Sequence, residues 1–160
     1  MRMSEEKEEG GCLFCRIVSG EIPSKKVYED ANTFAFLDIN PRNPGHTLVI
    51  PKKHYSTLFD MGEKDVGRLF ESVKLVAEAV RKGSGADGLS LIQSNGKAAG
   101  QVVSHLHVHL IPRFMNEGPV SPEAILAPKK MPEQVLDKLA SAIKDKMRPQ
   151  RDSGEIKFDF

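Results

Sequence analysis

Three histidines alternate with apolar residues in the segment Val103-Ser104-His105-Leu106-His107-Val108-His109-Leu110-Ile111-Pro112-Arg113, and the rest of the chain is interpreted from it. Successive side chains of a strand point to opposite faces, so the three imidazoles are predicted to share one face, about 6.5–7 Å apart. The apolar residues between them would then point into a core. We therefore predict a strand over residues 101–112 with histidines on its polar face.

Three interpretations of this histidine row compete. A polar face that is rich in histidine by chance is improbable, because the chain has 5 histidines in all. Three metal ligands are also disfavoured, since positions i, i+2 and i+4 spread over about 13 Å, whereas a Zn–N bond measures about 2.1 Å. One or two of the histidines can still bind a metal. The third interpretation is catalysis, in which one imidazole attacks while its neighbours orient it and stabilise charge.

The loop before the histidine segment favours catalysis. Residues 94–100 read Ser-Asn-Gly-Lys-Ala-Ala-Gly, and such small residues let backbone N–H groups approach an anion. Those donors would stabilise the charge that develops on phosphate oxygens. Taken alone, a loop of this composition is more often a plain turn. Its position directly before the histidines favours attack by one of them on a phosphorus centre.

Composition limits the class of protein. The chain has 160 residues, enough for one domain with a core, and a formal net charge of +1 that does not suggest nucleic-acid or membrane binding. No apolar run approaches the roughly 20 residues of a membrane span. The first residues, 1–9, are polar without the apolar segment of a signal peptide. We expect a cytoplasmic protein.

The remaining pattern predicts an α+β protein. Short strands are expected at residues 27–28, 33–37, 46–50 and 89–92, separated by turn residues that are typical of an antiparallel sheet. A short helix is predicted over residues 12–19. A long helix should start at a capping box, Asp60 to Glu63, and end at residues 83–85. Its predicted core-facing residues are Val66, Leu69, Phe70, Val73, Val76, Ala77 and Val80.

Several blocks in order resemble the histidine triad (HIT) superfamily. The histidine segment, extended to Gly100, resembles that family's signature. The other matching blocks are 12–17 (CLFCRI), 20–23 (GEIP), 27–30 (VYED), 35–39 (AFLDI) and 45–54 (GHTLVIPKKH). The resemblance covers about residues 12–114.

The resemblance implies a five-stranded antiparallel sheet with one long helix and short helices, continued across a homodimer into one sheet. The implied HIT domain covers residues 12–115. The polar composition of residues 1–11 predicts a flexible tail. The apolar spacing near residues 132–147 predicts a helix in a C-terminal extension over 116–160, which the resemblance does not cover. The implied ligand is a purine nucleotide such as an adenylate derivative. Neither nucleic acid nor a membrane is expected as a partner.

The resemblance also implies roles for individual residues. His107 would attack the α-phosphorus and become nucleotidylated, His109 would contact phosphate oxygens, and His105 would orient hydrogen bonds or bind a metal. Asp38 would hold the ribose hydroxyls. The other residues implied to contact the nucleotide are Phe14, Ile17, Phe36, Leu37, Ile39, Ser94, Asn95, Gly100, Gln101 and Val102.

Two positions depart from the family pattern. Many members have a phosphate-binding Asn where Ser94 stands, so Ser94 or the following Asn95 must take that role. Some members have Ser in place of Val102, and the hydroxyl of that Ser could reach the leaving group. Val102 lacks this hydroxyl. The substrate preference of any one branch of the family therefore does not transfer to this chain.

The two cysteines, Cys12 and Cys15, have the C-x-x-C spacing of a metal site or a redox pair. No βαβ pattern of the thioredoxin kind surrounds them, and both could also be ordinary buried thiols. The resemblance implies a structural zinc site formed by these thiols with His54 and His105. Two thiolates and two imidazoles are a ligand set that suits Zn²⁺.

We therefore expect a nucleotide hydrolase that cleaves nucleoside phosphoramidates or dinucleoside polyphosphates through a nucleotidyl-histidine. One alternative is a regulatory or adaptor protein that binds nucleotides with little turnover. The intact histidine row argues against it, because binding alone does not require His107 between two imidazoles. The other alternative is a nucleotidyltransferase, but the related uridylyltransferases usually have Gln where His109 stands.

Overall fold

The computed structural model describes residues 11–118 and 129–147. The chain divides between Pro119 and Val120 into two compact units, and each is described by itself. The elements of the first unit are α1 (Leu13–Val18), β1 (Lys26–Glu29), β2 (Thr33–Leu37), β3 (Thr47–Pro51), η1 (Leu58–Asp60), α2 (Glu63–Ser84), β4 (Gly88–Ile92), η2 (Lys97–Ala99), β5 (Val108–Arg113) and η3 (Met115–Glu117). The second unit contains α3 (Glu133–Lys146).

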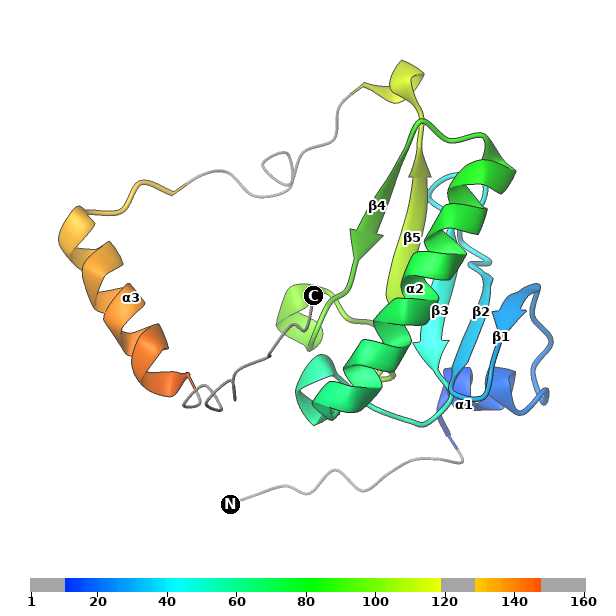
Figure 1. The fold of residues 1–160 in the computed structure, drawn as a ribbon, viewed down its shortest axis with the longest axis horizontal. Helices are drawn as coiled ribbons and strands as arrows, with labels where there is room; N and C mark the ends of the chain where they lie inside the picture. Colours follow the sequence, from blue (N-terminus) through cyan, green and yellow to red (C-terminus); the bar gives the residue numbers. More distant parts are fainter. Residues whose placement is uncertain (1–10, 119–128, 148–160) are drawn as a thin grey trace, which may run out of the picture. The chain divides into compact units, whose positions relative to one another are not determined.

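The five strands form one antiparallel sheet in the order β1-β2-β3-β5-β4. Helix α2 lies across one face of the sheet, and α1 lies near the end of β2 and β3 (Figure 1). The predicted α+β fold and its five-stranded antiparallel sheet are confirmed. Strand β4 is an edge strand and lies beside β5, which contains His109.

The alternation of side chains builds a separate core on each face of the sheet. Ala35 and Val49 pack with Leu69, Val73, Val76 and Val80 of α2. The residues next to them in the strands, Phe34, Phe36, Leu48 and Ile50, pack with Phe14 and Ile17 of α1. Full burial of one such side chain stabilises the fold by about 1.5–3 kcal/mol.

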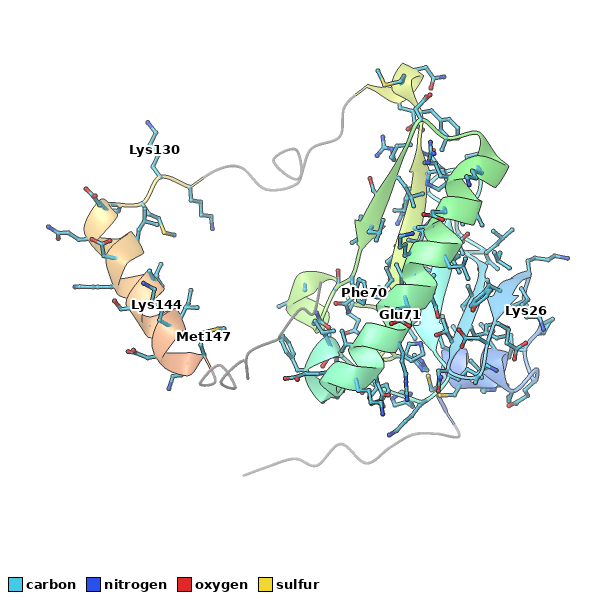
Figure 2. The ribbon with its side chains drawn as sticks, viewed as in Figure 1. Lys26, Phe70, Glu71, Lys130, Lys144 and Met147 are labelled. Atoms are coloured by element: carbon cyan, nitrogen blue, oxygen red, sulfur yellow. The ribbon has the colours of Figure 1, made fainter. Side chains whose placement is uncertain are left out.

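Helix α2 differs from its predicted form at two points. Its first residue follows Gly62, and the predicted capping box at Asp60 is wrong. The Asp60 carboxylate instead accepts hydrogen bonds from the backbone N–H and hydroxyl of Thr57, which closes η1. Phe70 is 42% exposed and lies beside Glu71 on the outer side of α2 (Figure 2), so it is not a core residue. At the other end Gly85 adopts φ +68°, as a helix-terminating glycine commonly does.

The predicted strand over residues 101–112 is too long, because β5 begins only at Val108. The β3–β5 pairing ends at Val49 opposite Val108, and extending it would bring Pro51 into register with Leu106. Pro51 has no N–H to donate to a ladder. The backbone N–H of Leu106 instead donates to the carbonyl of Tyr55, 2.6 Å away.

Helix α3 is amphipathic, and every described residue of the second unit is exposed. Lys144 and Met147 lie at its C-terminal end (Figure 2). Among the residues that the structure describes, no helix has the length and apolar character needed to cross a membrane.

Candidate functional site

The three histidines of the segment lie on the α1 side of the sheet. The sheet register pairs His109 with Leu48, which belongs to the core against α1. The residues between the histidines, Leu106, Val108 and Leu110, are at most 1% exposed and belong to the core against α2. The predicted alternation of faces therefore holds, although His105 and His107 precede the strand.

His107 is buried and held by a backbone group. Its Nδ1 lies 2.7 Å from the carbonyl oxygen of His105. A carbonyl only accepts, so Nδ1 carries a proton, and in the neutral ring the lone pair lies on Nε2. The His107 ring meets Phe14 edge-on at 5.2 Å between centroids and His109 at 4.9 Å. This arrangement presents Nε2 as a nucleophile in a fixed orientation.

His46 is a site residue whose role was not predicted. It is 2% exposed, and its Nε2 lies 2.9 Å from Nδ1 of His109. Burial lowers the pKa of His46, and burial together with the neighbouring imidazoles lowers that of His109 to about 4. Both rings are therefore neutral near pH 7. The available signal was that His46, Leu48 and Ile50 alternate onto one face of β3.

His105 points its two ring nitrogens at different partners. Nε2 lies 2.8 Å from the Pro51 carbonyl and therefore carries the proton, which leaves a lone pair on Nδ1. That Nδ1 lies 3.4 Å from Sγ of Cys12 and 3.6 Å from Sγ of Cys15. Burial lowers the pKa of His105 to about 4, so the ring stays neutral and is able to bind a metal.

Cys12, Cys15, His54 and His105 form a group that can hold a metal ion. Their ligand atoms all lie within 4.8 Å of one another. Nδ1 of His54 lies 3.4 Å from Sγ of Cys15, and the two imidazoles are perpendicular. The C-x-x-C spacing places both thiols at the start of α1, and neither thiol forms a disulfide. The donor set and the lone pair of His105 both fit a metal.

The apolar residues that the resemblance assigned to the nucleotide fall into two sets. Phe14, Ile17 and Phe36 are at most 8% exposed and pack in the core against α1. Of the three, Phe14 contacts the rings of both His105 and His107. Leu37 and Ile39 are 38% and 89% exposed, respectively, so their side chains are open to a ligand.

Asp38 lies between these exposed residues, directly after β2. Its Oδ1 accepts a hydrogen bond from the backbone N–H of Asn40 at 2.8 Å. Its Oδ2 lies 3.6 Å from Nε2 of His46, and 17% of its side chain is exposed. The predicted ribose ligand is thus connected to the histidine cluster.

Two amides hold the loop before the histidine segment. Gln101 donates to the carbonyl of Ser56 at 2.6 Å and accepts from the N–H of Gly96 at 2.7 Å. Asn95 accepts from the N–H of Leu58 at 2.7 Å. These hydrogen bonds fix the loop against the segment that follows β3. The contact of Asn95 and Gln101 with phosphate stays a prediction.

The other predicted loop residues are open. Gly96 and Gly100 adopt φ +86° and +87°, which glycine accommodates without strain. Val102 is 93% exposed, and Ser94 is partly exposed at the end of β4. Within the loop, the N–H groups of Ala99 and Gly100 donate to the carbonyls of Gly96 and Lys97.

Comparison with known proteins agrees with this geometry. The HIT domain model matches residues 19–116. An uncharacterised HIT-like protein from Methanocaldococcus jannaschii is 50% identical over 109 residues, which are 68% of this chain and 84% of that protein. An adenosine 5′-monophosphoramidase from Schizosaccharomyces pombe is 38% identical over 125 residues, covering 72% and 91%. A crystal structure of SMU.412c from Streptococcus mutans superposes with a TM-score of 0.78 at 40% identity, covering 92% and 91%. The chain belongs to the HIT family.

Proposed function

We propose that this protein is a nucleotide hydrolase that cleaves adenylate derivatives at the α-phosphorus, with His107 as the nucleophile. The observation that carries the proposal is the 2.7 Å hydrogen bond from His107 Nδ1 to the His105 carbonyl, which keeps the Nε2 lone pair available. The name of the Schizosaccharomyces pombe relative, an adenosine 5′-monophosphoramidase, supports phosphoramidates as the substrate class.

The reaction proceeds in two displacements. The Nε2 lone pair of His107 attacks phosphorus and forms a P–N bond, while the bond to the leaving group breaks. That group departs with its electron pair and takes up a proton from solvent, and the second displacement returns one proton from water to solvent. Water then attacks phosphorus, breaks the P–N bond to His107 and releases the nucleoside monophosphate. With adenosine 5′-phosphoramidate, one water is consumed and one AMP and one ammonia are formed.

The surrounding residues bind and orient the nucleotide. The partly exposed carboxylate of Asp38 accepts hydrogen bonds from the ribose hydroxyls, between Leu37 and Ile39. The loop before the histidine segment has small side chains and is held by Gln101, which lets the phosphate approach it closely. His109 donates from Nε2 to a phosphate oxygen, and Ser94 supplies a further hydroxyl donor.

The test is release of AMP, followed by chromatography, from adenosine 5′-phosphoramidate and separately from diadenosine tetraphosphate. We expect His107→Gly to lose activity by at least about 10³-fold, and added imidazole to restore part of it. The control is Lys74→Ala, at an exposed position on α2. If His107→Gly hydrolyses as fast as the natural protein, the nucleophile is wrong. If neither substrate reacts while AMP still binds, the protein is a nucleotide-binding module.

The Cys12–Cys15–His54–His105 group is proposed to bind Zn²⁺ in a structural site. A bound Zn²⁺ would link α1 to the histidine segment. The chain's own contribution is the fixed lone pair on Nδ1 of His105, set by the Pro51 carbonyl. Elemental analysis of purified protein should give about one zinc per chain, and Cys15→Ser should lose it. A natural protein that stays metal-free after growth with added zinc contradicts the site.

A homodimer is proposed to form along the open edge of β4. That strand pairs with β5 on one side, and Leu91 and Ile92 are 49% and 41% exposed. An unpaired, apolar edge readily accepts a second strand. Because β4 leads directly into the loop before the histidine segment, pairing there would also support the site.

A further inference from the structure

The hydrogen bonds of His46 fix which of its nitrogens carries the proton. The backbone N–H of Arg42 donates to Nδ1 of His46 at 3.0 Å. A backbone N–H only donates, so Nδ1 holds the lone pair and the proton of the neutral ring lies on Nε2. With a side chain 2% exposed, the ring has no freedom to exchange this arrangement for another.

The proton on Nε2 of His46 has two acceptors within reach. Nδ1 of His109 lies at 2.9 Å and Oδ2 of Asp38 at 3.6 Å. His109 is the closer and takes the hydrogen bond, so its own proton lies on Nε2. Asp38 acts on the same proton through its charge. His109 thus becomes a donor beside His107, whose ring centroid is 4.9 Å away.

A metal ion is the competing explanation of this cluster. The ligand atoms of Asp38, His46 and His109 do lie within 4.8 Å of one another. Binding a metal would require a lone pair on Nε2 of His46, which places its proton on Nδ1 against the N–H of Arg42. Two donors would then face each other in a buried position, and such a pair is costly. The cysteine-containing group has no such conflict, because His105 turns its lone pair inward.

Asp38 connects this chain of hydrogen bonds to the sugar. Of its two oxygens, Oδ1 is occupied by the N–H of Asn40, and Oδ2 lies toward His46. Hydroxyl groups that donate to the carboxylate spread its negative charge and weaken its attraction for the His46 proton. His46 then interacts less strongly with Asp38 and donates its proton more fully to His109.

We propose that Asp38, His46 and His109 form a relay in which bound ribose hydroxyls strengthen the hydrogen bond that His109 donates to phosphate. His46 is a positioning residue in this relay. The inference rests on the proposed function, because it takes the sugar subsite at Asp38 from there. Its consequence is that a sugar without hydroxyls slows the reaction itself, beyond weakening the binding of the nucleotide.

The direct test is ¹⁵N NMR of the imidazole nitrogens in the full-length protein, with adenosine and 2′,3′-dideoxyadenosine as probes. Neither nucleoside carries a phosphate, so neither touches His109 directly. We expect saturating adenosine to shift the His109 resonances and dideoxyadenosine to leave them in place. His46→Gln, whose amide N–H can replace Nε2–H, should keep the response. His46→Leu should lose the shift of the His109 resonances. If His46→Leu does not fold, Asp38→Asn, which keeps the shape of the side chain without its charge, should also lose that shift.

Single-turnover kinetics supply the second measurement. In the natural protein, the 2′-deoxy form of adenosine 5′-phosphoramidate should react about fivefold more slowly at saturation, the effect of one ordinary hydrogen bond. In His46→Leu the two substrates should agree within about twofold.

The outcomes separate the two proposals. If adenosine binds and shifts residues around Asp38 but not His109, the relay is wrong while the proposed function stands. An unchanged deoxy effect in His46→Leu also overturns the relay. If adenosine does not bind, the sugar subsite fails and the relay fails with it. If the nucleosides behave as expected but no phosphoramidate is cleaved, the relay holds and the proposed hydrolase activity fails.

Discussion

At the scale of single residues, backbone groups determine the protonation of the histidines. The Pro51 carbonyl, the His105 carbonyl and the Arg42 N–H each fix one ring, at 2.8, 2.7 and 3.0 Å. These backbone partners hold each neutral ring in one tautomer. The site is thus organised before a substrate arrives, and it does not depend on charged partners to set the proton of His107.

Acid should destabilise the protein through His109. Its pKa is about 4 in the folded chain and about 6.5 when unfolded, so between these values the unfolded state binds more protons. The contribution of His109 to the free energy of unfolding should therefore be complete above about pH 6.5 and be lost as the pH falls toward about 4. Urea unfolding at several pH values measures this. His109→Gln, which has no titrating ring, should show a shallower fall, and equal slopes for both proteins would contradict the assignment.

The histidine row and the cysteine pair were predictable from the sequence because alternation and C-x-x-C spacing are local patterns. His46 was not, because its role depends on the register of β3 against β5, which brings together residues 63 positions apart. The buried positions of Phe14 and Phe36 were missed for the same reason, since their burial is set by packing between α1 and β2.

At the scale of elements, the loop between β4 and β5 depends on Gln101. Its side chain is 9% exposed and bonds the carbonyl of Ser56 and the N–H of Gly96. Gln101→Leu leaves both backbone groups unpaired and should cost about 1–3 kcal/mol of unfolding free energy. Urea unfolding checks this against Lys97→Ala, an exposed position in the same loop. A loss no larger than that of Lys97→Ala would show that the loop is held otherwise.

The strands and α2 were predictable because each repeats a periodic apolar pattern over its length. The start of β5 was not, since the interruption comes from Pro51 on the neighbouring strand rather than from residues 101–107 themselves. The capping box was misplaced because Asp60 has a closer local partner in Thr57. The first error arises from the neighbouring strand, and the second from a competing cap within the same segment.

At the scale of the whole molecule, the open β4 edge predicts the state of assembly. Light scattering coupled to size exclusion should give twice the chain mass of 17.7 kDa for the natural protein. Leu91→Lys should shift the population to the monomer, because a charge at a strand edge opposes pairing. Val27→Lys is the matched control, since Val27 is 43% exposed on β1 at the opposite edge. A natural protein that elutes as a monomer contradicts the interface.

The central claim is that His107 carries the nucleotide during the reaction, and the most direct test is to trap that intermediate. The protein is mixed with adenosine 5′-phosphoramidate, quenched in base within the first turnover and analysed by peptide mass spectrometry. We predict a mass increase of one adenylyl group on His107 that is lost in acid, as expected for a P–N bond, and that is absent from His107→Gly. AMP release without any labelled histidine, or with the label on another residue, would contradict the account.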